Sequence, residues 1–336
     1  MIITKQRSNK VKNACVVGYG AIGSVHAQVL SENDAVTLYG ICDIDQARVD
    51  KGVEKYGCKG FRELKECLAD ANVDSVHICT PHYLHYEMTV QCIEAGKMVV
   101  IEKPVVMEPQ ELTVLLSDYG NKPIYPVMQN RENTCVKAMK EIVASESKNG
   151  KLIAVKGILT WYRDAQYYAG SQWRGTKAYE GGGVLINQAV HTLDLMIYLA
   201  GNVTDVTASI SNKSLQGVIE VEDTVDAYMK FANGATGIFY ATNAYGVNSK
   251  PQLELEFEHA SLRYMDGKLF RNGELVCCDD TAYNGKTYWG SGHAQLLYDL
   301  YSNGKAFSLA DVKNTMQTLF AIYDSAKTGT AQRISI

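Results

Sequence analysis

One ordered glycine signature near the start of the chain constrains the fold more than any other feature. The apolar run 14–17 leads into Gly18-Tyr19-Gly20-Ala21-Ile22-Gly23, which opens a helical pattern that continues to Leu30. A second apolar run ends at Asp43, twenty residues after Gly23. Strand, glycine turn, helix, strand and acid in this order form the dinucleotide-binding fingerprint of a βαβ unit.

Each glycine of this fingerprint has its own physical task. Gly18 allows the tight turn, Gly20 lets the backbone approach a pyrophosphate, and Gly23 lets the helix pack against the strand. Ala21 and Ile22 begin the helix, where free backbone N–H groups and the helix dipole favour a phosphate. We therefore expect these five residues to bind a dinucleotide.

The acid at the end of the second strand bears on the choice of cofactor. The Asp43 carboxylate can accept hydrogen bonds from a ribose 2′-OH, and it repels a 2′-phosphate. Arg48 follows about one turn into the next helix, where it could accept a phosphate. Because Asp43 lies at the fingerprint position itself, we expect NAD rather than NADP as the cofactor.

Strand and helix patterns alternate through the first third of the chain. Apolar strand candidates are 14–18, 36–43, 75–79, 98–101 and 124–128, and helix candidates are 21–30, 45–56, 62–69, 85–95 and 109–119. This alternation predicts parallel βαβ units with right-handed crossovers. We expect a Rossmann dinucleotide-binding domain over residues 1–127.

The pattern changes beyond this point, and strands dominate a second domain expected over residues 128–336. A helix is predicted over 132–144 and a strand over 151–160, and Gly181-Gly182-Gly183 precedes an apolar helix to Leu199. Strand segments 225–231 and 235–242 flank Asn233-Gly234, residues 253–258 alternate strictly, and helices are expected over 293–301 and 310–327. The prediction is an α+β domain with a large, mostly antiparallel open sheet.

Bulk properties exclude several classes of protein. The chain has 336 residues, more than a single core usually supports, and its net charge of −4 gives no reason to expect nucleic acid or a membrane surface as a partner. Nine cysteines form no C-x-x-C pair, which favours reduced thiols in a cytoplasmic protein and no metal site. The polar segment 1–10 shows no secretory signal, and no apolar run reaches membrane-spanning length.

Two further strands end in residues suited to a site. Open α/β sheets bind ligands beyond the carboxyl ends of their strands. One strand leads to Thr80, Pro81, His82 and His85, and the next leads to Glu102 and Lys103. We expect these residues to contact the cofactor.

Lys103 and His191 are the candidate catalytic residues. A lysine at a strand end can stabilise a developing alkoxide or relay a proton, and an imidazole can accept a hydroxyl proton. Asn187 lies four residues before His191, so the two should share one face of the apolar helix. The glycine triplet upstream is expected to allow a ligand to approach the start of that helix.

Taken in order, these motifs resemble one family. The glycine fingerprint, Cys79-Thr80-Pro81, Glu102-Lys103-Pro104 and the Gly-Gly-Gly…His helix are similar to those of the glucose–fructose oxidoreductase/inositol dehydrogenase (Gfo/Idh/MocA) family. The resemblance implies an NAD(P)-dependent dehydrogenase or reductase acting on a sugar, sugar derivative or cyclitol, with Lys103 and His191 as its catalytic pair. Many relatives have aspartate where this chain has Asn187, which weakens an inositol dehydrogenase assignment.

The second domain should supply the contacts to substrate. We expect them from Arg131, Arg163, Trp173, Arg174 and Asn187. The arginines could meet a carboxylate or phosphate on a sugar, or they could pair with acids such as Asp164 and Glu180. The substrate itself cannot be read from the fold.

Two alternatives and one assembly prediction accompany this interpretation. The chain could be a catalytically silent NAD-binding sensor, or an enzyme that uses tightly bound NAD for transient oxidation. The presence of both Lys103 and His191 argues against a sensor. A large sheet with an apolar outer face predicts a homodimer or homotetramer.

Overall fold

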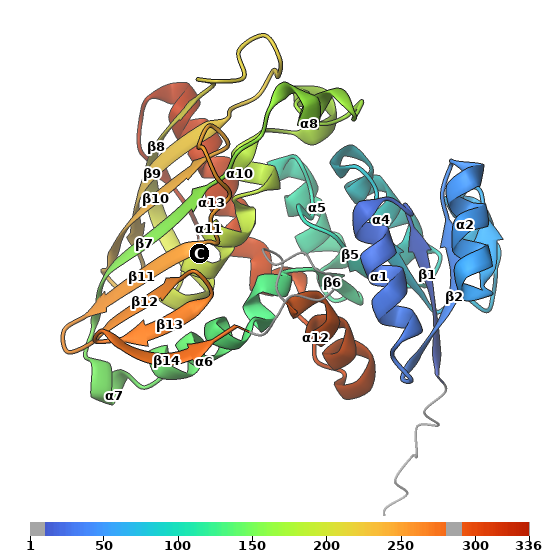
Figure 1. The fold of residues 1–336 in the computed structure, drawn as a ribbon, viewed down its shortest axis with the longest axis horizontal. Helices are drawn as coiled ribbons and strands as arrows, with labels where there is room; N and C mark the ends of the chain where they lie inside the picture. Colours follow the sequence, from blue (N-terminus) through green and yellow to red (C-terminus); the bar gives the residue numbers. More distant parts are fainter. Residues whose placement is uncertain (1–10, 280–290, 336) are drawn as a thin grey trace, which may run out of the picture.

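The computed structural model describes residues 11–279 and 291–335, and the polar segment 1–10 lies outside this range. Two sheets organise the chain, with the first sheet and its helices at one end of the molecule and the second sheet at the other (Figure 1). The first sheet has six parallel strands in the order β3-β2-β1-β4-β5-β6. Its strands are β1 (Lys12–Val17), β2 (Val36–Cys42), β3 (Lys59–Phe61), β4 (Ser75–Ile78), β5 (Met98–Ile101) and β6 (Ile124–Pro126).

Helices alternate with these strands as predicted. They are α1 (Ala21–Ser31), α2 (Gln46–Tyr56), α3 (Leu64–Ala69), η1 (His82–Leu84), α4 (His85–Glu94) and α5 (Pro109–Tyr119). Local chemistry fixes several ends. Asp45 caps α2 by accepting from the Ala47 N–H, and Glu108 and Glu111 form a capping box around Pro109 at the start of α5. The sequence analysis missed the short edge strand β3, which has only three residues.

The second sheet has nine strands in the order β14-β13-β12-β11-β7-β10-β9-β8-β15. They are β7 (Leu152–Thr160), β8 (Val203–Ser211), β9 (Thr224–Phe231), β10 (Thr236–Thr242), β11 (Gln252–Phe257), β12 (Ser261–Met265), β13 (Lys268–Arg271), β14 (Glu274–Cys278) and β15 (Gln332–Arg333). In the described part of this second sheet only β7 and β10 pair in parallel, and the other neighbours pair antiparallel. The predicted fold class, a Rossmann domain plus a mostly antiparallel sheet, is confirmed.

Helices cover one face of this second sheet. The helices after residue 128 are η2 (Gln129–Glu132), α6 (Thr134–Val143), α7 (Glu146–Asn149), α8 (Ala165–Ala169), α9 (Lys177–Glu180), α10 (Val184–Asn187), α11 (Val190–Ala200), α12 (Gly292–Tyr298), η4 (Asp299–Asn303) and α13 (Leu309–Thr328), and α6, α10, α11 and α13 contact the sheet. Helix α11 packs on β7 and β11, and α13 packs on β8. Among the described residues no single helix is long and apolar enough to cross a membrane; the bent pair Lys177–Asn187 and Val190–Ala200 meets that test by length and composition only.

The apolar helix predicted through Leu199 is interrupted, which corrects one expectation. The N–H of Ala189 donates to the carbonyl of Val184, five residues earlier, at 2.8 Å, and α10 ends there. Asn187 closes α10, whereas His191 lies in the first turn of α11. The two residues are therefore not on one continuous helix face.

The C-terminal part of the chain returns to the first sheet. Helix α12 packs against α1 and η2, and Leu296, Leu297 and Leu300 join a core cluster with Val25 and Val100. Helix α13 contacts α5 and β6. The division of the chain at residue 127 stays a prediction, and these contacts make the two sheets parts of one packed body.

Candidate active site

The glycine loop has the geometry that a dinucleotide needs. Gly18 has φ +89°, and a Cβ there would lie 2.7 Å from the carbonyl oxygen of Cys79. A Cβ on Gly23 would lie 1.9 Å from the carbonyl oxygen of Gly18, so α1 can approach β1 only with glycine there. On Gly20 a Cβ would meet only the Arg48 guanidinium, at 4.0 Å. The loop is thus closed toward the protein and open on the side of Gly20 and Ala21.

Asp43 follows β2 and braces this loop. Its Oδ2 accepts from the Tyr19 N–H at 2.7 Å, and its Oδ1 accepts from the Asp45 N–H at 2.9 Å. The Arg48 guanidinium lies 3.6 Å from Oδ2, with its own side chain half exposed. A carboxylate and a cation therefore stand together at the place expected for the ribose.

The loop after β4 is locked to its neighbours by two buried histidines. The His85 ring nitrogens lie 2.6 Å from the carbonyl oxygen of Pro104 and 2.9 Å from that of Thr80, which joins the loops after β4 and β5. The His82 Nδ1 lies 2.9 Å from the carbonyl oxygen of Glu180, and its ring lies 4.7 Å from that of Trp173. Both His85 nitrogens thus face backbone carbonyls, of which a neutral ring can donate to one, and the contacts of Thr80, Pro81, His82 and His85 with a cofactor stay predictions.

Lys103 reaches from the end of β5 into the second sheet's helices. Its Nζ donates to the backbone carbonyl of Asn187 at 2.9 Å and to the side-chain Oδ1 at 3.2 Å. Burial lowers the pKa of Lys103, and the nearby carboxylates of Glu102 and Glu180 oppose this shift. A lysine with a lowered pKa held at a strand end can exchange a proton more readily than a solvated one.

His191 lies next to this lysine in the first turn of α11. Its Nε2 is 3.1 Å from the amide Nε2 of Gln129, while its Nδ1 is buried with no hydrogen-bond partner in the described part of the chain. Burial and the Lys103 cation lower the pKa of His191 to about 3, so the imidazole is neutral at neutral pH. As placed, the amide nitrogen donates to Nε2, so the ring proton is on Nδ1. If the Gln129 amide is rotated by 180°, Oε1 accepts from an Nε2–H instead. Nδ1 then carries no proton and can accept one.

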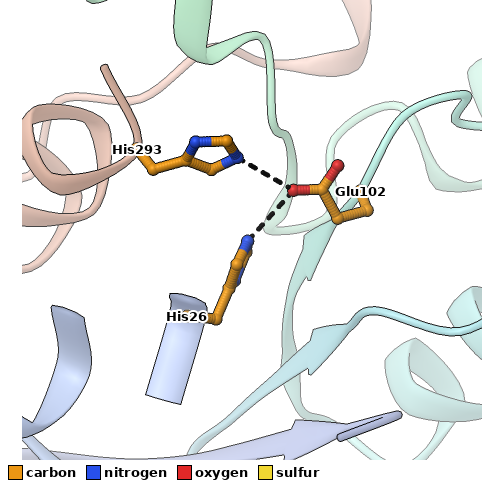
Figure 2. Close-up of side chains that lie close together, drawn as sticks. All are labelled: His26, Glu102 and His293. Carbon is orange, nitrogen blue, oxygen red and sulfur yellow. Dashed lines mark hydrogen bonds and ion pairs between the residues drawn. The ribbon is translucent and has the colours of Figure 1, made fainter. Parts of the chain in front are cut away.

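Glu102 is held by two histidines, as Figure 2 shows. Its Oε1 lies 3.0 Å from the Nε2 of His26 on α1 and 3.4 Å from the Nε2 of His293 on α12. Burial raises the pKa of Glu102, but the hydrogen bonds from His26 and His293 outweigh burial, and the pKa is well below its ordinary value. The carboxylate is therefore charged, and its Oε2 accepts from the backbone N–H of Lys103 at 3.2 Å.

A buried chain of hydrogen bonds continues from His26. Its Nδ1 is 2.9 Å from the Nδ1 of His77, whose Nε2 is 2.7 Å from the hydroxyl of Tyr301, which in turn is 2.8 Å from the Ser75 hydroxyl. Because the Glu102 carboxylate only accepts, His26 donates from Nε2 and accepts at Nδ1, and His77 donates from Nδ1. In this series each group then donates to the next one on the way to Glu102.

Arg131 is not at the site, which corrects its expected contact with substrate. It is 2% exposed, and its Nε and one terminal nitrogen donate to the two oxygens of Asp194 at 2.8 and 2.6 Å. The guanidinium also lies over the rings of Tyr198 and Phe307. With this ion pair buried between aromatic rings, Arg131 serves packing of the second domain.

Of the other expected substrate residues, Arg163 and Arg174 lie over one aromatic ring, whereas Asn187 contacts Lys103. The guanidinium carbons of Arg163 and Arg174 lie 4.9 and 5.2 Å from the centre of the Tyr167 ring. Arg174 also lies over Trp173, which contacts His82. These residues form a half-buried cationic patch, hereafter the Tyr167 patch, next to the loop after β4.

The glycine triplet packs against protein, which corrects its expected role of admitting a ligand. A Cβ on Gly182 would lie 2.0 Å from the Tyr323 hydroxyl, and one on Gly183 would lie 1.8 Å from the carbonyl oxygen of Glu222. The Glu222 carboxylate accepts from the N–H of Gly183 at 2.9 Å and caps α10. The triplet therefore sets where α10 and Asn187 stand.

Several site residues escaped the sequence analysis. Gln129 and His26 contact residues far away in the chain, and no local pattern marks them; His293 follows Gly292 in a stretch that also resembles the family, but no role was expected for it. Glu180 was noted only as a possible partner for arginine. Its position directly before the glycine triplet was the one sequence feature that could have pointed to a role for Glu180.

Two family models match the chain. The oxidoreductase family with an NAD-binding Rossmann fold matches residues 12–119, and the GFO/IDH/MocA C-terminal domain matches residues 136–263. Together these matches cover well over half of the chain. They fall on the two sheets described above.

Two of the similar proteins are dehydrogenases named for sugar compounds. The chain is 24% identical to D-glucoside 3-dehydrogenase of Escherichia coli over 94% of its own length and 95% of that protein. It is 28% identical to levoglucosan dehydrogenase of Pseudarthrobacter phenanthrenivorans, but this match spans only 59% of the chain and 57% of the relative.

Solved structures share the whole fold. The WlbA dehydrogenase of Chromobacterium violaceum, solved with NADH and UDP-GlcNAcA, superposes with a TM-score of 0.85 at 26% identity and covers 100% of this chain and 99% of its own. A levoglucosan dehydrogenase solved with NADH and levoglucosan gives a TM-score of 0.84 at 21% identity over 96% of this chain and 99% of its own.

Proposed function

Because the chain belongs to the GFO/IDH/MocA family of NAD-binding oxidoreductases, we propose that it moves hydride between a nicotinamide and a hydroxyl or keto carbon of a sugar or sugar derivative. The observation that carries this proposal is the contact of Lys103, from the end of β5, with Asn187 of the second domain. This contact holds the amino group of Lys103 at the strand ends, beside the glycine loop and beside His191. The sensor and transient-oxidation alternatives gain no support from the relatives, which are named for dehydrogenation.

The cofactor would be NAD, held by the glycine loop and Asp43. Support comes from the open side at Gly20 and from the carboxylate placed to meet a ribose hydroxyl. Arg48 beside Asp43 is the group that could instead accept a 2′-phosphate. When bound, the nicotinamide supplies the acceptor or donor of hydride.

Side chains of the protein accept the proton that leaves the substrate hydroxyl. In the oxidative direction, the substrate C–H gives up hydride and its hydroxyl gives up a proton, forming a carbonyl. His191 accepts that proton at the buried Nδ1, and the Lys103 ammonium stabilises the developing alkoxide. With its amide turned so that Oε1 accepts from the Nε2–H of His191, Gln129 would leave Nδ1 free to accept the proton, and Asn187 holds Lys103 in place.

The substrate would carry an anionic group. The Tyr167 patch presents Arg163 and Arg174 beside Trp173, a set suited to a carboxylate or phosphate on a sugar. The WlbA dehydrogenase, solved with an acidic nucleotide sugar, is compatible with this choice. Neutral sugars would then be poorer substrates than sugar acids or nucleotide sugars.

The test is a panel of neutral sugars, inositols, sugar acids and nucleotide sugars with NAD and NADP, followed by the absorbance of the reduced nicotinamide. The proposal expects turnover with an anionic sugar and NAD. Turnover restricted to neutral sugars would refute the prediction that the substrate carries an anionic group, but it would support the proposed hydride transfer. No turnover with any member, from protein shown to bind NAD, would count against the proposed reaction.

We also propose that the enzyme works in the cytoplasm as a homodimer or homotetramer. Its cysteines are free thiols, as a reducing compartment requires. The outer face of the second sheet exposes Tyr228 on β9 and Ile238 and Tyr240 on the adjacent β10. An apolar sheet face of this kind suits a second copy of the chain.

A further inference from the structure

A buried carboxylate stands beside the proposed site, and the reaction above does not use it. Glu180 closes α9 directly before Gly181, whose φ of +84° turns the chain toward α10. The residue is 1% exposed. Its Oε2 accepts from the backbone N–H of Gly175, and its Oε1 accepts from the Nδ2 of Asn187.

Asn187 connects this carboxylate to Lys103. The amide accepts from the Lys103 ammonium at Oδ1, at 3.2 Å, and donates from Nδ2 to Glu180. An amide has an acceptor at one end and donors at the other, so it can link an ammonium to a carboxylate without itself gaining a proton. Both polar ends of Asn187 are engaged in this link.

The surroundings of Glu180 contain charges of both signs. The cations of Arg174 and Lys103 favour its carboxylate, and the buried Glu222 opposes it. The hydroxyls of Tyr168 and Tyr323 also lie close enough for their own ionisation to respond to Glu180, and His82 meets its backbone carbonyl. Burial is the largest influence and raises the pKa of Glu180 to about 7.

We propose that Glu180 is a positioning residue for the reaction: through Asn187 it adds a second negative charge to that of Glu102, and this charge helps to keep Lys103 as an ammonium in the orientation needed to stabilise the alkoxide. The Asn187 amide carries no charge of its own, and Glu180 supplies one from the neighbouring helix α9. This inference rests on the proposed function. Its test therefore includes a measurement that needs no substrate.

The protonation of Glu180 gives the expected pH dependence. Above pH 7 the carboxylate is charged, and the link to Lys103 is complete. As pH falls through about 7, Glu180 takes up a proton, and the link that orients Lys103 loses its charge although Glu102 stays charged, so turnover should fall on the acid side. His191, with a pKa of about 3, cannot produce an acid limb at this pH.

The first measurement is the rate at which an acylating reagent labels Lys103, followed by mass spectrometry as a function of pH in the intact protein. Glu180→Gln should shift the midpoint of labelling to about one pH unit lower, because an ammonium that loses a nearby anion releases its proton more easily. Glu180→Asp should retain most of the wild-type midpoint. Glu220→Gln is the matched control, since that exposed carboxylate caps the other end of α9 at the Lys177 N–H.

The second measurement is the pH profile of kcat/KM with the substrate found in the panel. Wild type and Glu220→Gln should show an acid limb near pH 7, and Glu180→Gln should lack it while its turnover at pH 8 falls about tenfold. Asn187→Ala cuts the link from the other side, and adding Glu180→Gln to it should cause little further loss. Melting temperature and NAD binding show that each variant is folded.

The outcomes separate the two proposals. If Lys103 labels with the same midpoint in wild type and in folded Glu180→Gln, the role of Glu180 is wrong, whatever the turnover. If the midpoint shifts but no panel sugar reacts, the role of Glu180 in charging Lys103 stands and the proposed reaction fails. Should Glu180→Gln not fold, Asn187→Ala must lower the labelling midpoint, and an unchanged midpoint there rejects the proposal.

Discussion

The Nζ of Lys103 donates to both oxygens of Asn187, at 2.9 Å to the backbone carbonyl and 3.2 Å to the side-chain amide. This contact joins the end of β5 in the first sheet to the end of α10, which packs under the second. Glu222 fixes α10 through the Gly183 N–H, and Glu102 holds the Lys103 backbone N–H. The position of the lysine therefore depends on both halves of the chain.

Removing either proposed catalytic group should lower turnover far more than it lowers cofactor binding. Lys103→Met and His191→Ala should each reduce kcat by about 10²–10⁴-fold, which is the usual contribution of a positioned acid–base group. NAD binding, followed by fluorescence quenching, should stay near the wild-type value. Lys65→Met, which changes an exposed lysine, is the control. Near-normal turnover in both variants would show that the assigned chemistry is wrong.

Asp43 should control the choice between NAD and NADP. Asp43→Ala should weaken NAD binding by roughly one to two orders of magnitude, because a hydrogen bond to a charged group contributes about 1.5–3 kcal/mol. The gap between NAD and NADP should narrow, since the carboxylate that repels a 2′-phosphate is gone. Asp43 also accepts from Tyr19 N–H, so Asp43→Asn serves as the companion variant that can keep one acceptor oxygen. Dissociation constants for both cofactors give the answer, and an unchanged preference would remove the argument for NAD.

Local patterns were sufficient to predict the first sheet and its ligand loop. The glycine spacing, the apolar runs and the prolines after strands act within a few residues, so Gly18, Asp43 and Lys103 could be placed at neighbouring strand ends. Strand β3 was missed because Lys59-Gly60-Phe61 is too short to show alternation. The break between α10 and α11 was missed because nothing in Gln188-Ala189 resembles a helix stop.

The contacts that surround the catalytic pair could not be predicted in this way. Gln129 meets His191, and His293 meets Glu102, across long stretches of chain that only the folded arrangement closes. Arg131 has the same chemistry as Arg174, and sequence alone cannot tell a buried arginine from one at a site. Burial and partners decide the difference, and both are tertiary properties.

Arg131 should matter for stability and not for substrate binding. Arg131→Ala leaves the buried Asp194 without its cation, and loss of one partner of a buried pair costs about 3–5 kcal/mol in the free energy of unfolding. KM for the substrate should stay unchanged at a temperature where the variant is folded. Denaturant unfolding and steady-state kinetics measure the two effects. A raised KM in a variant of normal stability would show that Arg131 takes part in substrate binding after all.

The cluster of His26, Glu102 and His293 should work without a metal ion. Its ligand atoms lie within 4.8 Å of one another, a spacing that a cation could bridge. His26, however, donates from Nε2 to Glu102 while its Nδ1 meets His77, and metal binding would require that proton to leave. Dialysis against a chelator should leave turnover unchanged, and elemental analysis should find no stoichiometric metal. Lost activity that returns on adding zinc or manganese would overturn this expectation.

The outer face of the second sheet should be covered by another subunit. Tyr228 on β9 is 45% exposed, and Ile238 and Tyr240 on the adjacent β10 are 54% and 38% exposed. Single apolar residues on a surface are common, but Tyr228 and Ile238 pair directly across the two strands, and together with Tyr240 they form a continuous patch. Light scattering at micromolar concentration should therefore give a dimer or a tetramer. Ile238→Lys should shift the assembly toward monomer because it places an unpaired charge in the contact, whereas Leu275→Lys on the distant edge strand β14 should not. A wild-type monomer would leave this sheet face exposed and would contradict the proposed assembly.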